Sequence, residues 1–145
     1  MPVTICLNMI VKNESKIITR LFDTILPIID TYCICDTGST DDTKEIIENY
    51  FKEKKIPGKV IQESFKDFGH NRTVALKAAK NMGTYLLFLD ADMKLEISSD
   101  FDKQKLTAGA YLIRQGGGDF KYFNVVLILD ILNIFINSIQ PLELL

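Results

Sequence analysis

The sequence predicts an α/β domain whose sheet is mostly parallel and doubly wound. Short apolar segments rich in β-branched residues alternate with segments whose apolar residues recur at helical spacing, and this alternation runs through residues 3–95. Such connections between parallel strands are right-handed crossovers. With no internal repeat and no low-complexity linker, the 145 residues are expected to form one domain, long enough to bury a real core.

The first strand and helix are predicted from residues 3–25. The segment "VTICLNMIV", Val3 to Val11, is apolar throughout and fits a strand buried on both faces. A helix is expected from Glu14, and Pro27 stops its pattern. Its apolar face consists of Ile17, Ile18, Leu21, Phe22 and Ile25.

The second unit follows in the same order. "YCICD", residues 32–36, predicts a strand, "GST" a turn and "DDTKEIIENYFKEK" a helix. Ser39 or Thr40 is the expected N-cap, and Asp41 and Asp42 in the first turn suit the helix dipole. The core face of this helix is expected to carry Ile46, Ile47, Tyr50 and Phe51.

Residues 59–95 continue the alternation, and the pattern then changes. Strands are predicted at residues 59–65 and 84–89, with a helix over residues 70–82 between them. Residues 110–128 resemble two strands joined by a hairpin at Gly116 to Gly118, because no strand-to-helix phosphate loop surrounds these glycines.

The tail, residues 127–145, is strongly apolar but is interrupted by Asp130, Asn133 and Asn137. A membrane-spanning helix needs about 20 mostly apolar residues, and a central Asp costs about 2.5 to 3.5 kcal/mol on insertion scales. We therefore expect a core or interface helix, with a membrane-associated helix or a poorly ordered end as alternatives.

Composition excludes several classes of function. A net charge of -2 argues against a nucleic-acid partner. An odd number of cysteines in apolar surroundings predicts buried, reduced thiols at Cys6, Cys33 and Cys35. The chain opens without the pattern of a secretory leader, and a cytoplasmic location is expected.

Polar residues follow all four predicted parallel strands. They are "KNE" after the first strand, Asp36 at the end of the second, "KDFGHNR" after the third, and Asp90 and Asp92 after the fourth. The carboxyl ends of parallel strands share one edge of the sheet, and ligands bind there in open α/β sheets. These residues are therefore expected to meet in one site.

Asp90 and Asp92 carry the most specific chemistry. Either one alone is explained by a helix cap or an Asx-turn. As a pair they repel each other, and burying both without a cation would be costly. A hard divalent ion such as Mg²⁺ or Mn²⁺ removes that cost and also binds phosphate oxygens, so a nucleotide is the expected ligand.

Four blocks carry a family resemblance: "TICLNMIVKNE", "CICDTGSTDDTKEII", "FKDFGHNRTVALKAA" and "TYLLFLDADMKL". In order and spacing they resemble the nucleotide-sugar half of family 2 glycosyltransferases of the GT-A fold. The resemblance implies a Rossmann-like, three-layer α/β/α architecture. Residues 3–95 would be the nucleotide-sugar-binding part, and residues 96–145 a truncated acceptor-side part with the apolar tail.

The resemblance also implies roles on the nucleotide. Asp36 would accept a hydrogen bond from the uracil or ribose of a UDP-sugar donor, and the backbone from Val11 to Asn13 would line the base pocket. Asn13 and Glu14 belong to the matched block, with starting the first helix as the alternative. Arg72 would lie against the nucleotide or diphosphate, with a surface salt bridge as the alternative.

On the metal side, Asp92 would ligate Mn²⁺ or Mg²⁺, and Asp90 would hold the ribose or a metal-bound water, so both are candidate metal residues. Gly38 would supply a turn that needs positive φ. His70 lies beside Arg72 but is interpreted as a helix-start or surface residue, and Cys33 and Cys35 as core thiols.

The implied reaction is transfer of the sugar, with inversion, to a hydroxyl of an unknown glycan, protein or lipid acceptor. The resemblance departs here: no paired acidic motif follows Asp92, so no catalytic base is assigned. One alternative is a non-catalytic binding module, and in either case we expect the tail to mediate a homodimer. A nucleotidyltransferase is disfavoured because no glycine-rich, lysine-containing phosphate loop is present.

Overall fold

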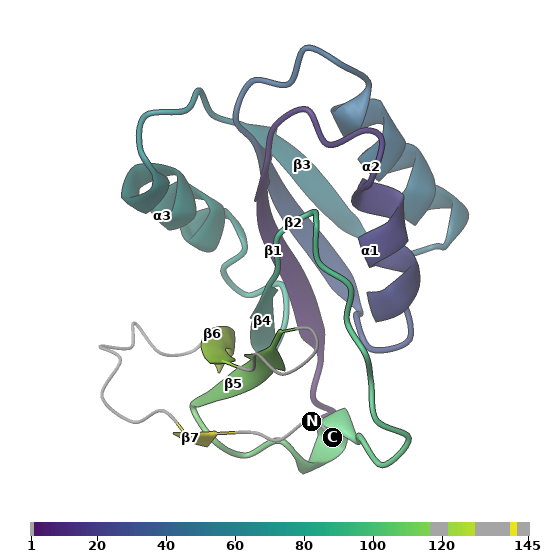
Figure 1. Cartoon of the computed structure of the whole chain (residues 1–145), viewed down its shortest axis with the longest axis vertical. Coiled ribbons are helices and arrows are strands. Elements are labelled where there is room, and N and C mark those ends of the chain that lie inside the picture. The colour runs from purple at the N-terminus through teal and green to yellow at the C-terminus, as the bar shows by residue number, and fades with distance from the viewer. Residues whose placement is uncertain (1, 117–121, 130–139, 142–145) are drawn as a thin grey trace.

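The computed structural model describes residues 2–116, 122–129 and 140–141. These residues form one mixed sheet, whose strands run in the order β3-β2-β1-β4-β6-β5-β7 (Figure 1). The strands are β1 (Ile5–Val11), β2 (Thr31–Asp36), β3 (Gly58–Gln62), β4 (Tyr85–Phe88), β5 (Ala110–Gln115), β6 (Tyr122–Leu129) and β7 (Gln140–Pro141).

The parallel half of the sheet confirms the predicted alternation. β1 lies between β2 and β4 and is parallel to both, and β3 continues the parallel pairing beyond β2. The register pairs Val11 with Asp36, the last residues of β1 and β2, so these two strands end at the same level. The strand ends therefore share one edge of the sheet, as the sequence predicted.

Among the described residues, three α-helices complete the α/β/α layers. α1 (Ile18–Ile25) and α2 (Thr43–Glu53) pack against each other on one face of the sheet, and α3 (Phe68–Ala78) covers the other face (Figure 1). On the first face the rings of Phe22 and Phe51 lie 4.6 Å apart, and Phe51 stacks on Tyr32 at 4.2 Å. This aromatic cluster fixes both helices to β2.

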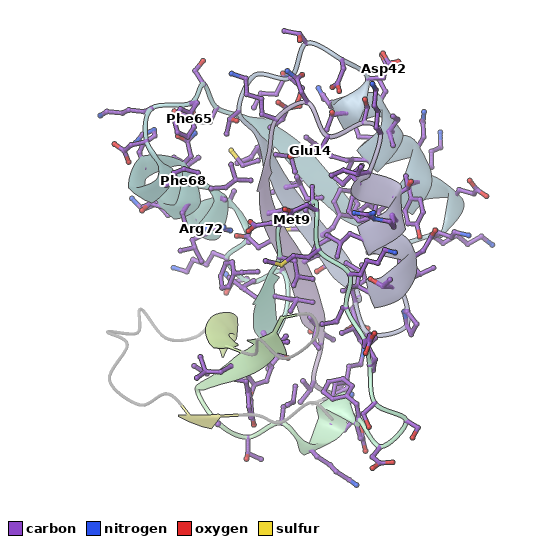
Figure 2. The ribbon with its side chains drawn as sticks, viewed as in Figure 1. Met9, Glu14, Asp42, Phe65, Phe68 and Arg72 are labelled. Atoms are coloured by element: carbon purple, nitrogen blue, oxygen red, sulfur yellow. The ribbon has the colours of Figure 1, made fainter. Side chains whose placement is uncertain are left out.

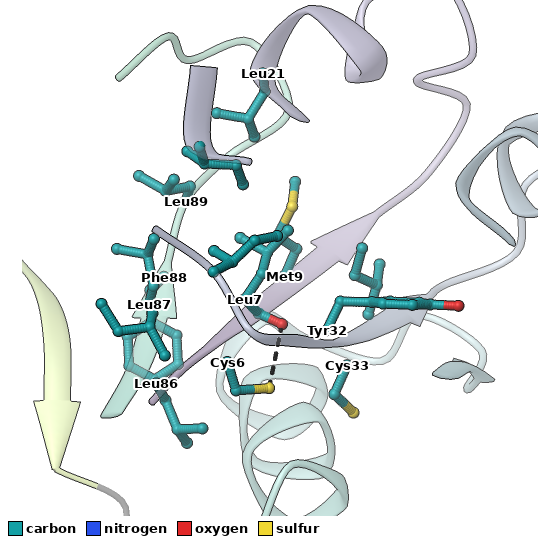
Figure 3. Packing of buried hydrophobic residues seen from close by; sticks show 14 of the residues in the cluster. Cys6, Leu7, Met9, Leu21, Tyr32, Cys33, Leu86, Leu87, Phe88 and Leu89 are labelled. Carbon is teal, nitrogen blue, oxygen red and sulfur yellow. Dashed lines mark hydrogen bonds between the residues drawn. The ribbon is translucent and has the colours of Figure 1, made fainter. Parts of the chain in front are cut away.

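All three cysteines are buried and form no disulfide, as expected. The Cys6 and Cys33 side chains point to the same side of the sheet within the apolar core (Figure 3). Burial raises the pKa of the Cys33 and Cys35 thiols, which favours the neutral, unreactive form.

The predicted starts of the first two helices are wrong. α1 begins at Ile18, because the Glu14 carbonyl accepts hydrogen bonds from the amides of Ile17 and Ile18 in a preceding turn. α2 begins at Thr43 after Asp42, which makes no side-chain capping bond. Neither Ser39 nor Thr40 caps α2, because both contact Asn13 in the neighbouring loop.

The predicted hairpin strands are confirmed as the antiparallel pair β5 and β6. β6 also pairs antiparallel with β4 and runs to Leu129, so the helix expected for the tail is wrong for residues 127–129. The rest of that tail, apart from the short strand β7, and the turn glycines 117 and 118 lie outside the described residues. Where the structure is described, no helix has the length and apolar character needed to cross a membrane.

Candidate functional site

The candidate site lies at the carboxyl edge of the parallel strands. The β1–α1 loop brings Asn13 and Glu14, the end of β2 brings Asp36, and the loop after β4 brings Asp90 and Asp92. Arg72 comes from α3, on the opposite side of the sheet from α1 and α2 (Figure 2). The fold thus carries all of the predicted polar residues to one edge, although they are far apart in the chain.

Asp36 organises the turn that leaves β2. Asp36 is 2% exposed, and its Oδ1 accepts hydrogen bonds from the amides of Gly38 at 2.9 Å and Ser39 at 2.7 Å. Gly38 has φ of +115°, the positive value that was expected for this turn. The buried carboxylate is therefore held in place by the backbone that follows it.

The β1–α1 and β2–α2 loops are joined by reciprocal hydrogen bonds, which we call the loop clasp (residues 11–15 with residues 37–43). Val11 O accepts from Thr37 N at 2.9 Å, and Asn13 N donates to Ser39 Oγ at 2.9 Å. Thr40 N donates to Asn13 Oδ1 at 2.7 Å. Further bonds run from Glu14 N to Thr43 Oγ1 at 2.9 Å and from Ser15 N to Asp41 Oδ2 at 3.3 Å. The loops therefore support each other.

Asp41 is the charged member of the loop clasp. Hydrogen bonds from Ser15 and Thr43 stabilise its ionised form and lower the pKa of Asp41 to about 2. The carboxylate is thus an acceptor for both loops over the whole neutral range.

Arg72 is held against the sheet by burial and by an aromatic contact. Its guanidinium carbon lies 5.3 Å from the ring centroid of Phe88, and Nη1 is buried with no hydrogen-bond partner in the described part of the chain. Burial lowers the pKa of Arg72, and the negative charge of Asp90 opposes this effect. Arg72 is therefore a desolvated cation facing a carboxylate, and no salt bridge of Arg72 is found among the described residues.

Asp90 and Asp92 lie on an exposed turn after β4, in which Met93 N donates to Asp90 O at 3.0 Å. Arg20 of α1 donates to the Asp92 carbonyl at 3.4 Å. Both residues are exposed, so water shares the solvation of the two carboxylates. Desolvation, followed by the charges of Asp92, Asp41 and Asp90, raises the pKa of Glu14, so the edge carries a concentrated negative potential.

Comparisons with known proteins agree with this geometry. The family model for glycosyl transferase family 2 matches residues 6–100. The chain belongs to glycosyl transferase family 2. No curated protein matches it.

Solved structures resemble this family 2 domain. S. aureus TarS 1-349 in complex with UDP is 26% identical over 80% of this chain and 36% of that one, with a TM-score of 0.60. The mannosyltransferase PcManGT from Pyrobaculum calidifontis, in complex with GDP-Man and Mn²⁺, is 18% identical over 77% of this chain and 35% of that one, with a TM-score of 0.62. The domain thus spans about a third of the length of these structures, and the second likeness concerns the fold alone.

The side chains of this family 2 site supply only part of the ligand set that a divalent cation would need. The described residues contain no group of three or more His, Cys, Asp or Glu side chains placed to hold a metal ion. Two exposed carboxylates on one turn are nevertheless the set that Mg²⁺ uses when phosphate oxygens and water complete its shell. The negative potential that raises the pKa of Glu14 would be relieved by such a cation.

Two asparagines of the family 2 domain escaped the sequence analysis. Asn71 is fully buried; its Oδ1 accepts from Lys66 N at 2.9 Å, and its Nδ2 donates to Ser64 O at 3.2 Å, which fixes the β3–α3 loop. Asn8, also fully buried, donates from Nδ2 to the carbonyls of Cys33 and Ala75 and so ties β1 to β2 and α3. An Asn within an otherwise apolar strand segment was the available signal for Asn8.

The β3–α3 loop and the first residue of α3 also expose aromatic side chains. Phe65 is 49% and Phe68 76% exposed, and their rings meet edge to face at 5.7 Å (Figure 2). His70 lies in the first turn of α3, as expected, where its amide donates to Asp67 Oδ1 at 2.7 Å. Its Nε2 is 3.1 Å from Glu63 Oε1, so His70 has a structural role in this loop.

Proposed function

We propose that this family 2 domain binds a UDP-sugar together with Mn²⁺ or Mg²⁺ and transfers the sugar to an acceptor hydroxyl. The observation that carries the proposal is Arg72, whose buried Nη1 has no hydrogen-bond partner among the described residues. A buried guanidinium N–H without an acceptor costs free energy, and an anionic diphosphate oxygen would satisfy it. The likeness to TarS in complex with UDP, at 26% identity, supports the choice of ligand.

The uridine side of the proposed site is centred on Asp36. Its Oδ1 accepts hydrogen bonds from two backbone amides, and these bonds orient the carboxylate. An ionised carboxylate accepts hydrogen bonds only, so it matches the N3–H of uracil or a ribose hydroxyl. Val11, Asn13 and Glu14 would border this pocket, because the loop clasp holds their loop against the Asp36 turn.

The phosphate side of the proposed site is formed by Arg72, Asp90 and Asp92. Asp92, with Asp90, would hold the divalent cation on the exposed turn after β4. Such a cation, when bound, supplies positive charge against the diphosphate oxygens. Arg72 would face the same oxygens from α3 and stabilise the charge that develops on the departing nucleoside diphosphate.

In the proposed reaction the acceptor hydroxyl attacks the anomeric carbon from the face opposite the diphosphate, so the configuration inverts. Residues 3–95 would supply donor binding, and residues 96–145 would belong to the acceptor side. No carboxylate of this chain is assigned as the base, and the acceptor class stays open between glycan, protein and lipid. The transfer step belongs to the proposal because the domain spans about a third of TarS 1-349.

Nucleotide selectivity tests the proposal. Calorimetry with UDP, ADP and GDP in the presence of Mn²⁺ should show tightest binding of UDP. Asp36→Asn keeps an oxygen for the Gly38 and Ser39 amides but replaces an acceptor by a donor, so it should weaken UDP by about 1.5 to 3 kcal/mol. Asp42→Asn, at the exposed start of α2, is the matched control. Equal affinity for the three nucleotides, or an unchanged Asp36→Asn variant, would contradict the assignment.

A further inference from the structure

Asn13 has an unusual backbone conformation in the β1–α1 loop. Its φ is +53°, in the left-handed region that Asn and Gly enter most readily. In this conformation the backbone amide and the side chain of Asn13 both bond to the β2–α2 loop. Asn13 N donates to Ser39 Oγ at 2.9 Å, and Asn13 Oδ1 accepts from Thr40 N at 2.7 Å.

These bonds place Asn13 between the Asp36 turn and Glu14. Ser39, which accepts from Asn13, is itself held by Asp36 through its own amide at 2.7 Å. On the other side, the next residue is Glu14, whose amide donates to Thr43 Oγ1 at 2.9 Å, at the start of α2. A continuous path of hydrogen bonds and covalent bonds thus runs from Asp36 through Asn13 to Glu14.

We propose that Asn13 is a positioning residue, which acts on the nucleotide by fixing the Asp36 turn relative to Glu14 and the β1–α1 loop. This inference rests on the proposed function and deepens it. The side-chain oxygen of Asn13 is engaged within the protein, so its effect on binding passes through the loop clasp. Without the Asn13 side chain, a smaller fraction of the free protein has the binding-competent arrangement, and the apparent affinity for the nucleotide falls in proportion.

The chemistry of the position separates this role from direct contact with the nucleotide. Positioning needs positive φ and an acceptor at Oδ1, and both Asn and Asp supply them. Direct contact with nucleotide oxygens needs the Nδ2 donor, which Asp lacks. Glycine permits the backbone conformation but offers neither acceptor nor donor.

The test compares UDP affinity, by calorimetry, in the parent chain, Asn13→Gly and Asn13→Asp. We expect Asn13→Gly to weaken UDP about tenfold, the equivalent of one net hydrogen bond, and Asn13→Asp to stay within about threefold of the parent. Asn81→Gly is the matched control, because Asn81 also has positive φ, +65°, in the turn after α3. Its affinity for UDP should equal that of the parent.

Hydrogen exchange supplies the second measurement, made without nucleotide. The Thr40 amide, which donates to Asn13 Oδ1, should exchange faster in Asn13→Gly than in the parent. In Asn13→Asp it should exchange at the rate of the parent. Faster exchange with unchanged UDP affinity would show a merely structural residue and overturn the inference. Equal loss of affinity in both Asn13 variants would assign direct contact and overturn it as well. A parent chain that binds no UDP would instead overturn the proposed function and, with it, the inference.

Discussion

The guanidinium group of Arg72 lies over the ring of Phe88, with Cζ 5.3 Å from the ring centroid. Arg72 comes from α3 and Phe88 from the end of β4, so this contact docks a cation next to the turn that carries Asp90 and Asp92. Packing against the ring costs the guanidinium part of its hydration and leaves Nη1 facing no acceptor in the described chain. The arrangement holds a positive charge ready for an anion.

Replacing Arg72 by Lys keeps the charge but removes the planar fork that suits a diphosphate. We expect UDP affinity to fall by about 1.5 to 3 kcal/mol, the range for hydrogen bonds to charged groups, in a calorimetric titration. Lys77→Gln, on the exposed side of the same helix, should bind as the parent does. Full affinity in the Arg72→Lys variant would remove Arg72 from the phosphate site.

Asp41 predicts a pH dependence of the loop clasp. Its pKa is lowered from 3.8 in the unfolded chain to about 2 in the fold, so its contribution to stability is complete above about pH 4 and is lost as the pH falls towards 2. In urea unfolding, Asp41→Asn should therefore have a lower midpoint than the parent at pH 6, and the difference should shrink at pH 2.5. Asp42→Asn controls for net charge. A difference that is independent of pH would contradict the role of the ionised carboxylate.

Replacing Glu14 by a neutral residue is expected to stabilise the fold. Desolvation and the charges of Asp92, Asp41 and Asp90 raise its pKa, so its ionised form destabilises the metal-free fold once the pH exceeds the unfolded value of 4.5. Glu14→Gln should raise the free energy of unfolding at pH 7, by up to about 1 kcal/mol, and leave it nearly unchanged at pH 3.5. Glu48→Gln, exposed on α2, is the control. Destabilisation at pH 7 would show that Glu14 is held by attraction instead.

Asn71 predicts a localised loss of stability. It is fully buried and bonds the backbone of Lys66, Ser64 and Glu63, so Asn71→Ala should lower the free energy of unfolding by about 1 to 3 kcal/mol. Hydrogen exchange should show the change first at the Lys66 amide. Lys77→Ala serves as a control on the same helix, and an unaffected Lys66 amide would refute the role of Asn71 in the loop.

Much of the fold was predictable because its signals are local. Apolar strands such as β1 and β4, and the aromatic face that includes Phe51, are recognisable from the pattern of apolar residues along the chain. Parallel pairing of the strands then brings Asp36 and Asp90 to one edge of the sheet. That reasoning needs only the order of the elements along the chain.

What sequence reasoning missed depends on contacts between distant residues. Ser39 and Thr40 are residue types that commonly cap helices. Both instead form hydrogen bonds with Asn13 of another loop, and α2 starts later in the chain. Likewise, the apolar run at Leu127 fits a strand as well as a helix, and its pairing with Leu87 of β4 decides the outcome. The contact of Arg72 with Phe88 also joins two elements whose proximity no local pattern reveals.

The dependence of UDP binding on Mn²⁺ through Asp92 is the most direct test of a donor site at this edge of the sheet. UDP affinity is measured by calorimetry with and without Mn²⁺ in the parent chain, in Asp92→Asn, and in Asp100→Asn, an exposed Asp further along the chain. Mn²⁺ should strengthen UDP binding in the parent chain and in Asp100→Asn, while Asp92→Asn, which removes one charge at constant shape, should lose most of that enhancement. Equal enhancement by Mn²⁺ in the parent and in Asp92→Asn would contradict a cation-assisted donor site at the end of β4.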